Sequence, residues 1–438
     1  MDNLPQASPD NVGRTVLVVG GAGFIGGYLV AALRRHGWNV LRAVRPKGRA
    51  LADDERACDL QAMVRLEDWL PLLDGVDAVV NAAGILREEG GQTFEAIHVE
   101  APFALAQACL ARGVGRFVQV SALGLPEDGP FIASKHRFDE RLGGLALSSV
   151  VLRPSVVYSV SGSYGGTSLL RALAGFPGVQ WLPGDGHWQV QPLAAEDLGE
   201  LVARAASGTV TGIYDVGGPA PLSLRDYQGQ WRRWLRVPGA RVVAVPEAAV
   251  SLAVTVMEAL GRGPVGRTMW RMLRRGNTAG PDAGERLAAD FGMRPRTLED
   301  ALASAPSQVQ DRWQAELYFL APALRASVVA LWLLSALAGF LTPAADILRL
   351  SSGTPLDAMD PVLLARGGGV ADLMLGLWLA SGRRPRAAVS AMLLLLLAYT
   401  LVLGIAVPAL WWDPLGGLAK NLVLLPALAV LWVLTERR

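Results

Sequence analysis

Three glycines near the start of the chain have the spacing of a phosphate-binding turn. Gly20, Gly23 and Gly26 follow the apolar segment TVLVVG at 15–20 and open the segment GFIGGYLVAALRRHG. The short β-branched run predicts a buried strand, and the segment after it predicts a helix. Backbone without side chains can approach a pyrophosphate closely, and a helix N-terminus stabilises the anion. The sequence therefore predicts a dinucleotide-binding site at this turn.

Basic residues lie within and directly after the second expected strand, NVLRAV. Arg42, Arg45 and Lys47 lie at its end, and the first acidic residue comes only at Asp53. A site specific for NAD usually places Asp or Glu here to bind the ribose hydroxyls, whereas cations suit the 2′-phosphate of NADP. We therefore favour NADP(H) over NAD(H). The alternative is a solvated basic loop with no ligand.

These residues need a scaffold, and the first part of the chain alternates between strand and helix patterns. Strands are expected at 15–20, in NVLRAV, at 77–84, in RFVQVSA and in SVVLRPSVVY, with helices between them. This alternation is typical of βαβ units with right-handed crossovers. We expect an α/β Rossmann domain, a doubly wound parallel sheet, over residues 14–305. Residues 1–13 are expected to be disordered, and residues 177–305 to form a cap on the substrate side.

The composition changes towards the C-terminus. Hydrophobic residues make up 51% of the chain and charged residues 18%, and the mean hydropathy is +0.31. Apolar stretches of about 20 residues, the length that crosses a bilayer, lie near 322–342, 362–381, 387–408 and 415–434. We expect a linker over 306–320 and an all-α transmembrane four-helix bundle over 321–438. Four soluble buried helices are the alternative, which fits poorly with stretches that are apolar on every face.

The charges around these stretches predict the topology. SGRRPR at 381–386 separates the second and third stretches, and ERR ends the chain. Basic residues favour the cytoplasmic side. The first residues, MDNLPQASPDNVGR, do not resemble a signal peptide. We expect a multi-pass protein of the inner (cytoplasmic) membrane, with the Rossmann domain and the C-terminus in the cytoplasm.

Two further segments have two interpretations each. VGRTMWRMLRR at 265–275 is basic and amphipathic, so it either lies on an anionic membrane surface or packs on the Rossmann domain. In the second apolar stretch, Asp372 would sit near mid-depth, with Arg366 in the same stretch and Lys420 in the fourth. We favour a structural ion pair between helices. The alternative is a polar centre for a quinone-like or lipid-like ligand.

Several motifs together resemble the extended or atypical short-chain dehydrogenases. These motifs are GGAGFIG, CDL at 58–60, NAAG at 81–84, VSALG at 120–124, FxxSK at 131–135, LRPSVVY at 152–158 and QPLAAEDL at 191–198. The resemblance covers about residues 14–305 and is strongest to the branch of the NADPH-binding accessory subunit of respiratory complex I. The C-terminal part resembles a DoxX-like four-helix membrane domain, on hydropathy and position.

The resemblance implies a role for each matching residue. Ser121 occupies the catalytic serine position, and Lys135 the position of the lysine that binds the nicotinamide-ribose hydroxyls. Arg45 is our candidate for the 2′-phosphate of NADP. The other expected cofactor-binding residues are Gly20, Gly23, Phe24, Ile25, Gly26, Asp59, Leu60, Ala82, Ala83, Gly84, Pro154 and Val156.

One position departs from the family pattern. The tyrosine that acts as the family's general acid–base group is replaced by Phe131. Phenylalanine cannot transfer a proton, and loss of such a group costs on the order of 10²- to 10⁴-fold in rate. Tyr158 and Tyr164 are alternative proton donors, but the spacing does not place either at the site. The sequence thus keeps the cofactor motifs and loses the standard proton donor.

Other function classes receive no support. The two cysteines and four histidines form no metal-binding spacing, so we assign no metal. The formal net charge of +2 does not suggest a nucleic-acid partner. The leading hypothesis is a membrane-anchored NADP-dependent oxidoreductase acting on an apolar or membrane-borne substrate. The second is a non-catalytic NADPH-binding module, and the third a transporter or membrane enzyme with a regulatory Rossmann domain. The sequence names no protein partner.

Overall fold

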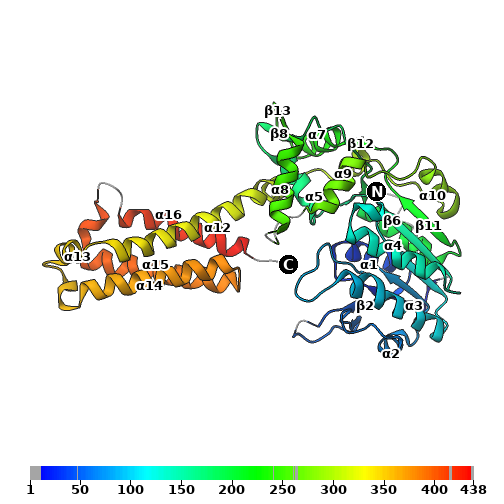
Figure 1. Ribbon diagram of the computed structural model, residues 1–438, viewed down its shortest axis with the longest axis horizontal. Coiled ribbons are helices and arrows are strands. Elements are labelled where there is room, and N and C mark those ends of the chain that lie inside the picture. The colour runs from blue at the N-terminus through cyan, green and yellow to red at the C-terminus, as the bar shows by residue number, and fades with distance from the viewer. Residues whose placement is uncertain are drawn as a thin grey trace. The chain divides into compact units, whose positions relative to one another are not determined.

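The computed structural model describes residues 11–435, apart from residues 47, 240, 260, 262–264 and 414–416. The chain forms two compact units, Met1–Ala315 and Glu316–Arg438 (Figure 1). Most of the expected disordered tail, residues 1–13, lies outside the described residues. Asn11 is buried and donates hydrogen bonds to the His36 carbonyl at 3.1 Å and the Ser207 hydroxyl at 2.8 Å. The first unit therefore includes part of the segment that we expected to be disordered.

A parallel sheet of seven strands forms the centre of the first unit. In spatial order the strands are β11 (Gly212–Val216), β6 (Ser149–Pro154), β5 (Arg116–Val120), β4 (Ala78–Asn81), β1 (Thr15–Val19), β2 (Asn39–Val44) and β3 (Glu55–Ala57). The strand order reverses at β1, which pairs with β2 on one side and β4 on the other. Val19 is in register with Asn81. The residues that follow these two strands meet at this switch point, where such sheets bind ligands.

Helices cover both faces of the sheet, as in a doubly wound fold (Figure 1). The helices on one face are α1 (Phe24–Arg35), α6 (Ala195–Ser207) and α10 (Ala283–Phe291). Those on the other are α2 (Leu66–Trp69), α3 (Ala101–Arg112) and α4 (Pro130–Gly143). The strands contribute alternate side chains to both layers, because successive residues point to opposite faces. Val16 and Val18 pack under α1, whereas Leu17 and Val19 pack under α3. The expected fold class is confirmed.

The rest of the first unit is built on short paired strands. The pairs are β7 (Val157–Tyr158) with β10 (Leu193–Ala194), β8 (Val179–Pro183) with β13 (Arg241–Val245), and β9 (Gln189–Val190) with β12 (Leu222–Ser223). The helices are α5 (Gly166–Gly175), α7 (Leu224–Trp234), α8 (Glu247–Ala259), α9 (Arg267–Arg275) and α11 (Leu298–Ala303). Our expectation of one continuous cap over 177–305 was wrong. The chain returns to the main sheet as α6 and β11, since the amphipathic α6 buries its apolar side on that sheet.

Helix α9 contains most of the basic segment at 265–275, for which we considered either a membrane surface or packing on the Rossmann domain. Its Trp270 is buried and lies edge-to-face on Trp188, with ring centroids 5.5 Å apart. Leu273 packs on the core beneath the helix. The apolar side of α9 thus faces the protein interior, because only there does it find apolar neighbours. The packed interpretation holds, and α9 itself does not present an apolar side to a membrane.

The second unit is helical. Its helices are α12 (Val309–Leu341), which begins in the first unit, α13 (Ala344–Ser351), α14 (Pro361–Ser381), α15 (Pro385–Ala406) and α16 (Asn421–Leu434). Three of them, α12, α14 and α15, are long and apolar enough to cross a membrane, and a shorter apolar helix covers Leu418–Leu434. The first two residues of the fourth expected stretch, 415–434, lie outside the described residues. The segment 306–320, which we expected to be a linker, is mostly helical, because α12 already starts at Val309. The first turns of α12 are polar, so hydropathy alone did not predict that the helix begins there.

Polar side chains in this unit do not form the ion pair that we expected. Asp372 is buried and hydrogen-bonds to the Ser335 hydroxyl at 2.6 Å. Arg366 instead donates to the carbonyls of Gly339 and Thr342, the latter at 2.8 Å. No ion pair joins Asp372 to Arg366 or Lys420 within the helices that the structure describes. The favoured structural pair was therefore wrong, since the guanidinium binds the carbonyls at the end of α12.

Candidate cofactor site

The glycine turn has the shape of a phosphate cradle. Gly20 has a φ of +84°, and a Cβ there would lie 2.9 Å from the Ala82 carbonyl carbon. A Cβ on Gly26 would lie 2.1 Å from the Gly20 oxygen, which also accepts a 2.9 Å bond from the Gly23 amide. No side chain caps the N-terminus of α1 at Gly23. The first amides of α1, from Phe24 and Ile25 onward, are therefore free for an anion.

The basic cluster after β2 is smaller than its sequence suggests. Arg42 makes two hydrogen bonds to Asp54, at 2.8 and 2.9 Å, which hold the pKa of Asp54 at about 2. Arg42 is thus occupied by a carboxylate. Arg45 is exposed and forms no ion pair with any residue that the structure describes. Lys47 lies outside the described residues. Of Arg42 and Arg45, therefore, Arg45 is the one without an ion pair among the described residues.

The residues expected along the nucleotide follow the carboxyl ends of β3 and β4. Asp59 accepts a 3.3 Å bond from the Gln61 amide, and Leu60 packs on the core next to it. Ala82 continues from β4, with its amide bonded to the Val19 carbonyl at 2.9 Å. Ala83 and Gly84 lead towards Lys135: a Cβ on Gly84 would lie 3.1 Å from Nζ. Ala82 and Ala83 therefore lie directly against the turn at Gly20, whereas Asp59 and Leu60 follow the neighbouring edge strand β3.

Lys135 is the charged group at the centre of the site. Its Nζ donates to the carbonyls of Ala83 at 2.8 Å and Val120 at 3.3 Å, at the ends of β4 and β5. Burial lowers the pKa of Lys135 to about 8, an effect that the carboxylate of Asp139 partly offsets. An ammonium held on two carbonyls at the sheet edge can exchange one of them for a ribose hydroxyl. This geometry fits the role implied by the family resemblance.

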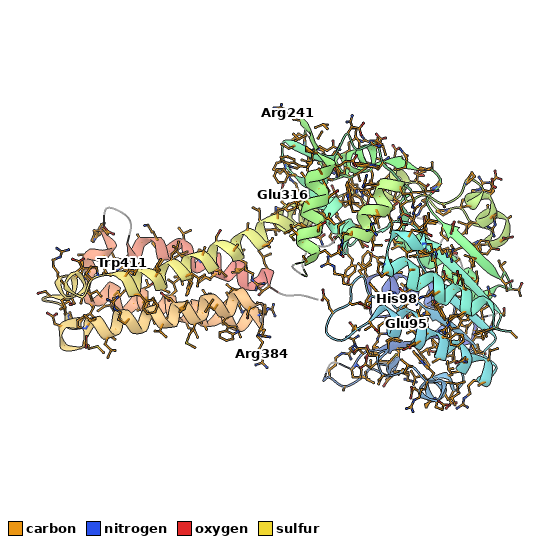
Figure 2. The ribbon with its side chains drawn as sticks, in the orientation of Figure 1. Glu95, His98, Arg241, Glu316, Arg384 and Trp411 are labelled. Carbon is orange, nitrogen blue, oxygen red and sulfur yellow. The ribbon has the colours of Figure 1, made fainter. Side chains whose placement is uncertain are left out.

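A histidine that we left unassigned lies beside the position of the missing tyrosine. His98 belongs to a π-helical turn, Glu95–Glu100 (η3), where Figure 2 labels it next to Glu95. Its ring meets Phe131 edge-on at 5.6 Å. The Ile85 amide donates to Nε2 at 3.0 Å, so the proton is on Nδ1, which faces the Ser134 hydroxyl at 2.8 Å.

His98 does not replace the tyrosine as a proton donor. Burial, with a smaller effect from Lys135, lowers its pKa to about 2. Both ring nitrogens are occupied by protein groups. The residue is a neutral, positioned ring that orders the loop after β4 and the start of α4. The π-helical turn is the feature associated with functional sites, but it has no clear pattern in the sequence.

Ser121 faces a buried ionic network. Its hydroxyl donates to Asp139 Oδ2 at 2.8 Å, and Arg153 Nε donates to the same oxygen at 2.9 Å. Burial raises the pKa of Asp139 despite these two bonds. The hydroxyl proton of the expected catalytic serine is therefore directed to a carboxyl group. Asp139 follows Lys135 by four residues on α4, so the two side chains lie on the same side of that helix.

The two alternative tyrosines lie in different surroundings. Tyr158 is buried, and its ring meets Trp231 edge-on at 5.9 Å. Burial raises its pKa above the usual range of a phenol. Tyr164 is exposed and stacks on Phe24 with centroids 6.0 Å apart, directly beside the glycine turn. Tyr164 thus contacts the first residue of α1, which follows the glycine turn.

The loop after β6 carries the residues expected beside the nicotinamide. Pro154 ends β6, and its carbonyl accepts a 2.9 Å bond from the Leu123 amide. Val156 packs on the neighbouring core and accepts from the Leu193 amide at 2.9 Å. Among the residues that the structure describes, no group of three or more His, Cys, Asp or Glu side chains could hold a metal.

Comparisons with known proteins agree with this geometry. Residues 16–164 match the NAD dependent epimerase/dehydratase family, and residues 329–432 match the DoxX-like family. A rice (Oryza sativa subsp. indica) protein named divinyl chlorophyllide a 8-vinyl-reductase is 28% identical over 57% of this chain and 65% of its own length. The ceramide reductase of Caulobacter vibrioides is 28% identical over 33% of this chain and 46% of its own length. The chain thus spans less than two thirds of these relatives.

Solved structures support the fold. The structure described as gox2253 is 21% identical, with a TM-score of 0.52, and covers 67% of this chain and 96% of its own. UDP-glucuronic acid 4-epimerase from Bacillus cereus, solved with UDP-glucuronic acid and NAD, is 16% identical, with a TM-score of 0.50, over 70% of this chain and 100% of its own.

The first unit has a Rossmann fold, and its residues 16–164 are similar to the NAD dependent epimerase/dehydratase family. It is followed in the chain by a helical unit whose residues 329–432 are similar to the DoxX-like family, with three described helices long and apolar enough to cross a membrane.

Proposed function

We propose that this protein is a membrane-anchored, NADP(H)-dependent oxidoreductase that acts on an apolar, membrane-borne substrate. The observation that carries the proposal is the cradle of Gly20, Gly23 and Gly26 with Lys135 held on two carbonyls at the adjoining strand ends. This arrangement offers a pyrophosphate site and a ribose-binding lysine side by side. The same chain carries helices that are long and apolar enough to cross a membrane.

When bound, the nicotinamide would supply or accept a hydride. In the reductive direction, substrate, NADPH and one proton give reduced substrate and NADP⁺. Lys135 would bind the nicotinamide ribose, and the backbone amides at Gly23 would bind the pyrophosphate. Phe131 contributes only an apolar surface. The proton then comes from water or from another side chain, and Tyr164 is the nearest candidate on the loop beside Phe24.

The class of substrate follows from two considerations. The two relatives described above are named for the reduction of chlorophyllide and ceramide, both of which are large and largely apolar molecules. The aromatic group of Phe94, His98 and Phe131 presents mainly apolar surface beside the site. An apolar substrate suits these surroundings, and the attached helical domain would keep the enzyme where such a substrate dissolves.

A second function is favoured by a specific observation. The Ser121 hydroxyl is bonded to Asp139, and the tyrosine position carries Phe131, so both standard proton-handling groups are unavailable. A non-catalytic NADPH-binding module, serving assembly, stability or redox sensing, would show this pattern. Binding alone stabilises a folded protein by mass action.

A paired experiment separates the two functions. Purified full-length protein is titrated with NADPH and NADH by tryptophan fluorescence, and NADPH absorbance is then followed with lipid-soluble ketones and quinones. Tight binding with oxidation supports the enzyme. Tight binding with no oxidation across the panel favours the binding module, and absence of binding contradicts both.

The membrane topology belongs to this proposal. We propose four spans in the inner membrane, with the Rossmann domain and the C-terminus in the cytoplasm, because SGRRPR and the terminal ERR are basic. A reporter fused after Arg438 should then be cytoplasmic. A periplasmic reporter would contradict the four-span topology.

A further inference from the structure

Helix α8 carries its apolar residues on the outside. Leu252, Val256 and Met257 are 66%, 46% and 39% exposed, and no residue of this helix is buried. The residues exposed with them are Ala248, Ala249, Ala253, Thr255 and Ala259. The exposed face thus contains no charged residue. Contiguous apolar surface of this kind marks an interaction site.

The charged residues of α8 point towards α9 instead. Glu247 pairs with Arg274 at 3.3 Å, and Glu258 pairs with Arg267 at 3.2 Å. Between these pairs, Trp270 donates to the Ser251 hydroxyl at 2.9 Å. These three contacts set the rotation of α8 about its own axis. Turning the apolar face inward would break all three, so its exposure is built into the hairpin.

Helix α9 in turn is fixed to the body of the first unit. Arg275 pairs with Asp128 at 2.8 Å, and a Cβ on Gly129 would clash with the Thr268 hydroxyl at 2.2 Å. Trp270 is buried against Trp188. Helix α9 is therefore fixed to the body of the first unit, and α8 is held on the outer side of α9 by the three contacts described above.

The chain itself indicates what covers this surface. Helix α12, which continues as a membrane-crossing helix, begins inside the first unit. There, Asp311 pairs at 2.8 Å with the buried Arg171, and Ala315 is buried beside Leu235. The first unit thus continues along the chain into a helix that is long and apolar enough to cross a membrane, so this covalent link tethers it to a bilayer.

The length and charge of the hairpin suit the surface of a bilayer. Thirteen residues of helix extend about 20 Å, too short to cross about 30 Å of hydrocarbon. A short helix with an apolar face can lie in the interface instead, and the basic residues of such a hairpin are on α9 rather than on α8. Arg271 of α9 is exposed and forms no ion pair with any described residue, so it can bind a lipid phosphate. We propose that the outer face of α8 docks on the bilayer, at the boundary between headgroups and acyl chains.

A lipid-quenching experiment tests this docking. The two native cysteines, Cys58 and Cys109, are buried, so an introduced surface cysteine can be labelled selectively. Full-length Leu252→Cys, labelled with bimane, is placed in nanodiscs of phosphatidylethanolamine and phosphatidylglycerol that contain a lipid with a doxyl group high on the acyl chain. The matched control is Ile213→Cys on edge strand β11, which has 41% exposure. Docking predicts at least twofold stronger quenching at position 252 than at position 213.

Two results would overturn the proposal. One is equal or absent quenching at both positions. The other is a bimane change at position 252 that follows protein concentration without spin-labelled lipid, which would mean that a second copy of the chain covers α8. A second variant, Leu252→Asp with the label at Val256→Cys, should lose the quenching while keeping its thermal midpoint and NADPH affinity. Docking does not depend on turnover, so a failed proposed function leaves this test intact.

Discussion

Substitution of Arg45 by alanine tests the preference for NADP at the end of β2. The neighbouring Arg42 is bound to Asp54 at 2.8 and 2.9 Å, whereas Arg45 is exposed and has no ionic partner in the described chain. A charge-assisted hydrogen bond contributes about 1.5–3 kcal/mol, and an exposed ion pair contributes about 0.2–1 kcal/mol. A phosphate on an exposed arginine should fall between these, at about 1–2 kcal/mol.

This energy corresponds to roughly 5- to 30-fold weaker NADPH binding in Arg45→Ala. NADH lacks the 2′-phosphate, so its affinity should change less than twofold. The assay is fluorescence titration of the full-length protein with each nucleotide at low and high salt, and the difference should shrink at high salt because screening weakens exposed charges. Arg65→Ala, which removes another exposed arginine, is the control. Equal loss of NADPH and NADH affinity would refute the 2′-phosphate role.

Three further predictions concern the turn and its neighbours. Gly26→Ala should lower the affinity for both nucleotides at least 10-fold in the same titration, because its Cβ would lie 2.1 Å from the Gly20 oxygen. The control Gly27→Ala has open space around its Cβ and should bind both nucleotides normally. Normal binding by Gly26→Ala would contradict the cradle. Phe131→Tyr restores a phenol four residues before Lys135 and should raise the rate of NADPH oxidation by up to about 10²- to 10⁴-fold with any substrate that turns over; an unchanged rate would show that the missing tyrosine is not limiting. His98 has a pKa lowered from 6.5 to about 2, so the stability that it contributes is complete above pH 6.5 and is lost as the pH falls towards 2. Between pH 7 and pH 5, the thermal midpoint of His98→Asn should therefore fall by less than that of the native protein. Equal decreases would exclude His98 as the cause of the loss of stability at low pH.

Sequence patterns were sufficient for the Rossmann scaffold and the glycine turn. Both are local: β-branched runs form buried strands, and Gly20 and Gly26 are required by backbone contacts that any such turn makes. The apolar stretches of α14 and α15 were equally readable, because a bilayer demands length and composition rather than particular partners.

The roles of several polar and apolar residues were decided only by the tertiary structure. The sequence suggested Arg42 for a phosphate site, but in the fold its guanidinium binds Asp54. The sequence likewise suggested Arg366 as a partner of Asp372, but it binds a backbone carbonyl of α12. His98 carried no signal in the sequence, since its position depends on Ile85 and Ser134 from separate segments. The exposed apolar face of α8 could not be predicted either. The sequence does not show that Glu247 and Glu258 will both face α9, which leaves the apolar side of the helix outside. Spacing along the chain determines local conformation, but the pairing of side chains depends on which segments the fold brings together.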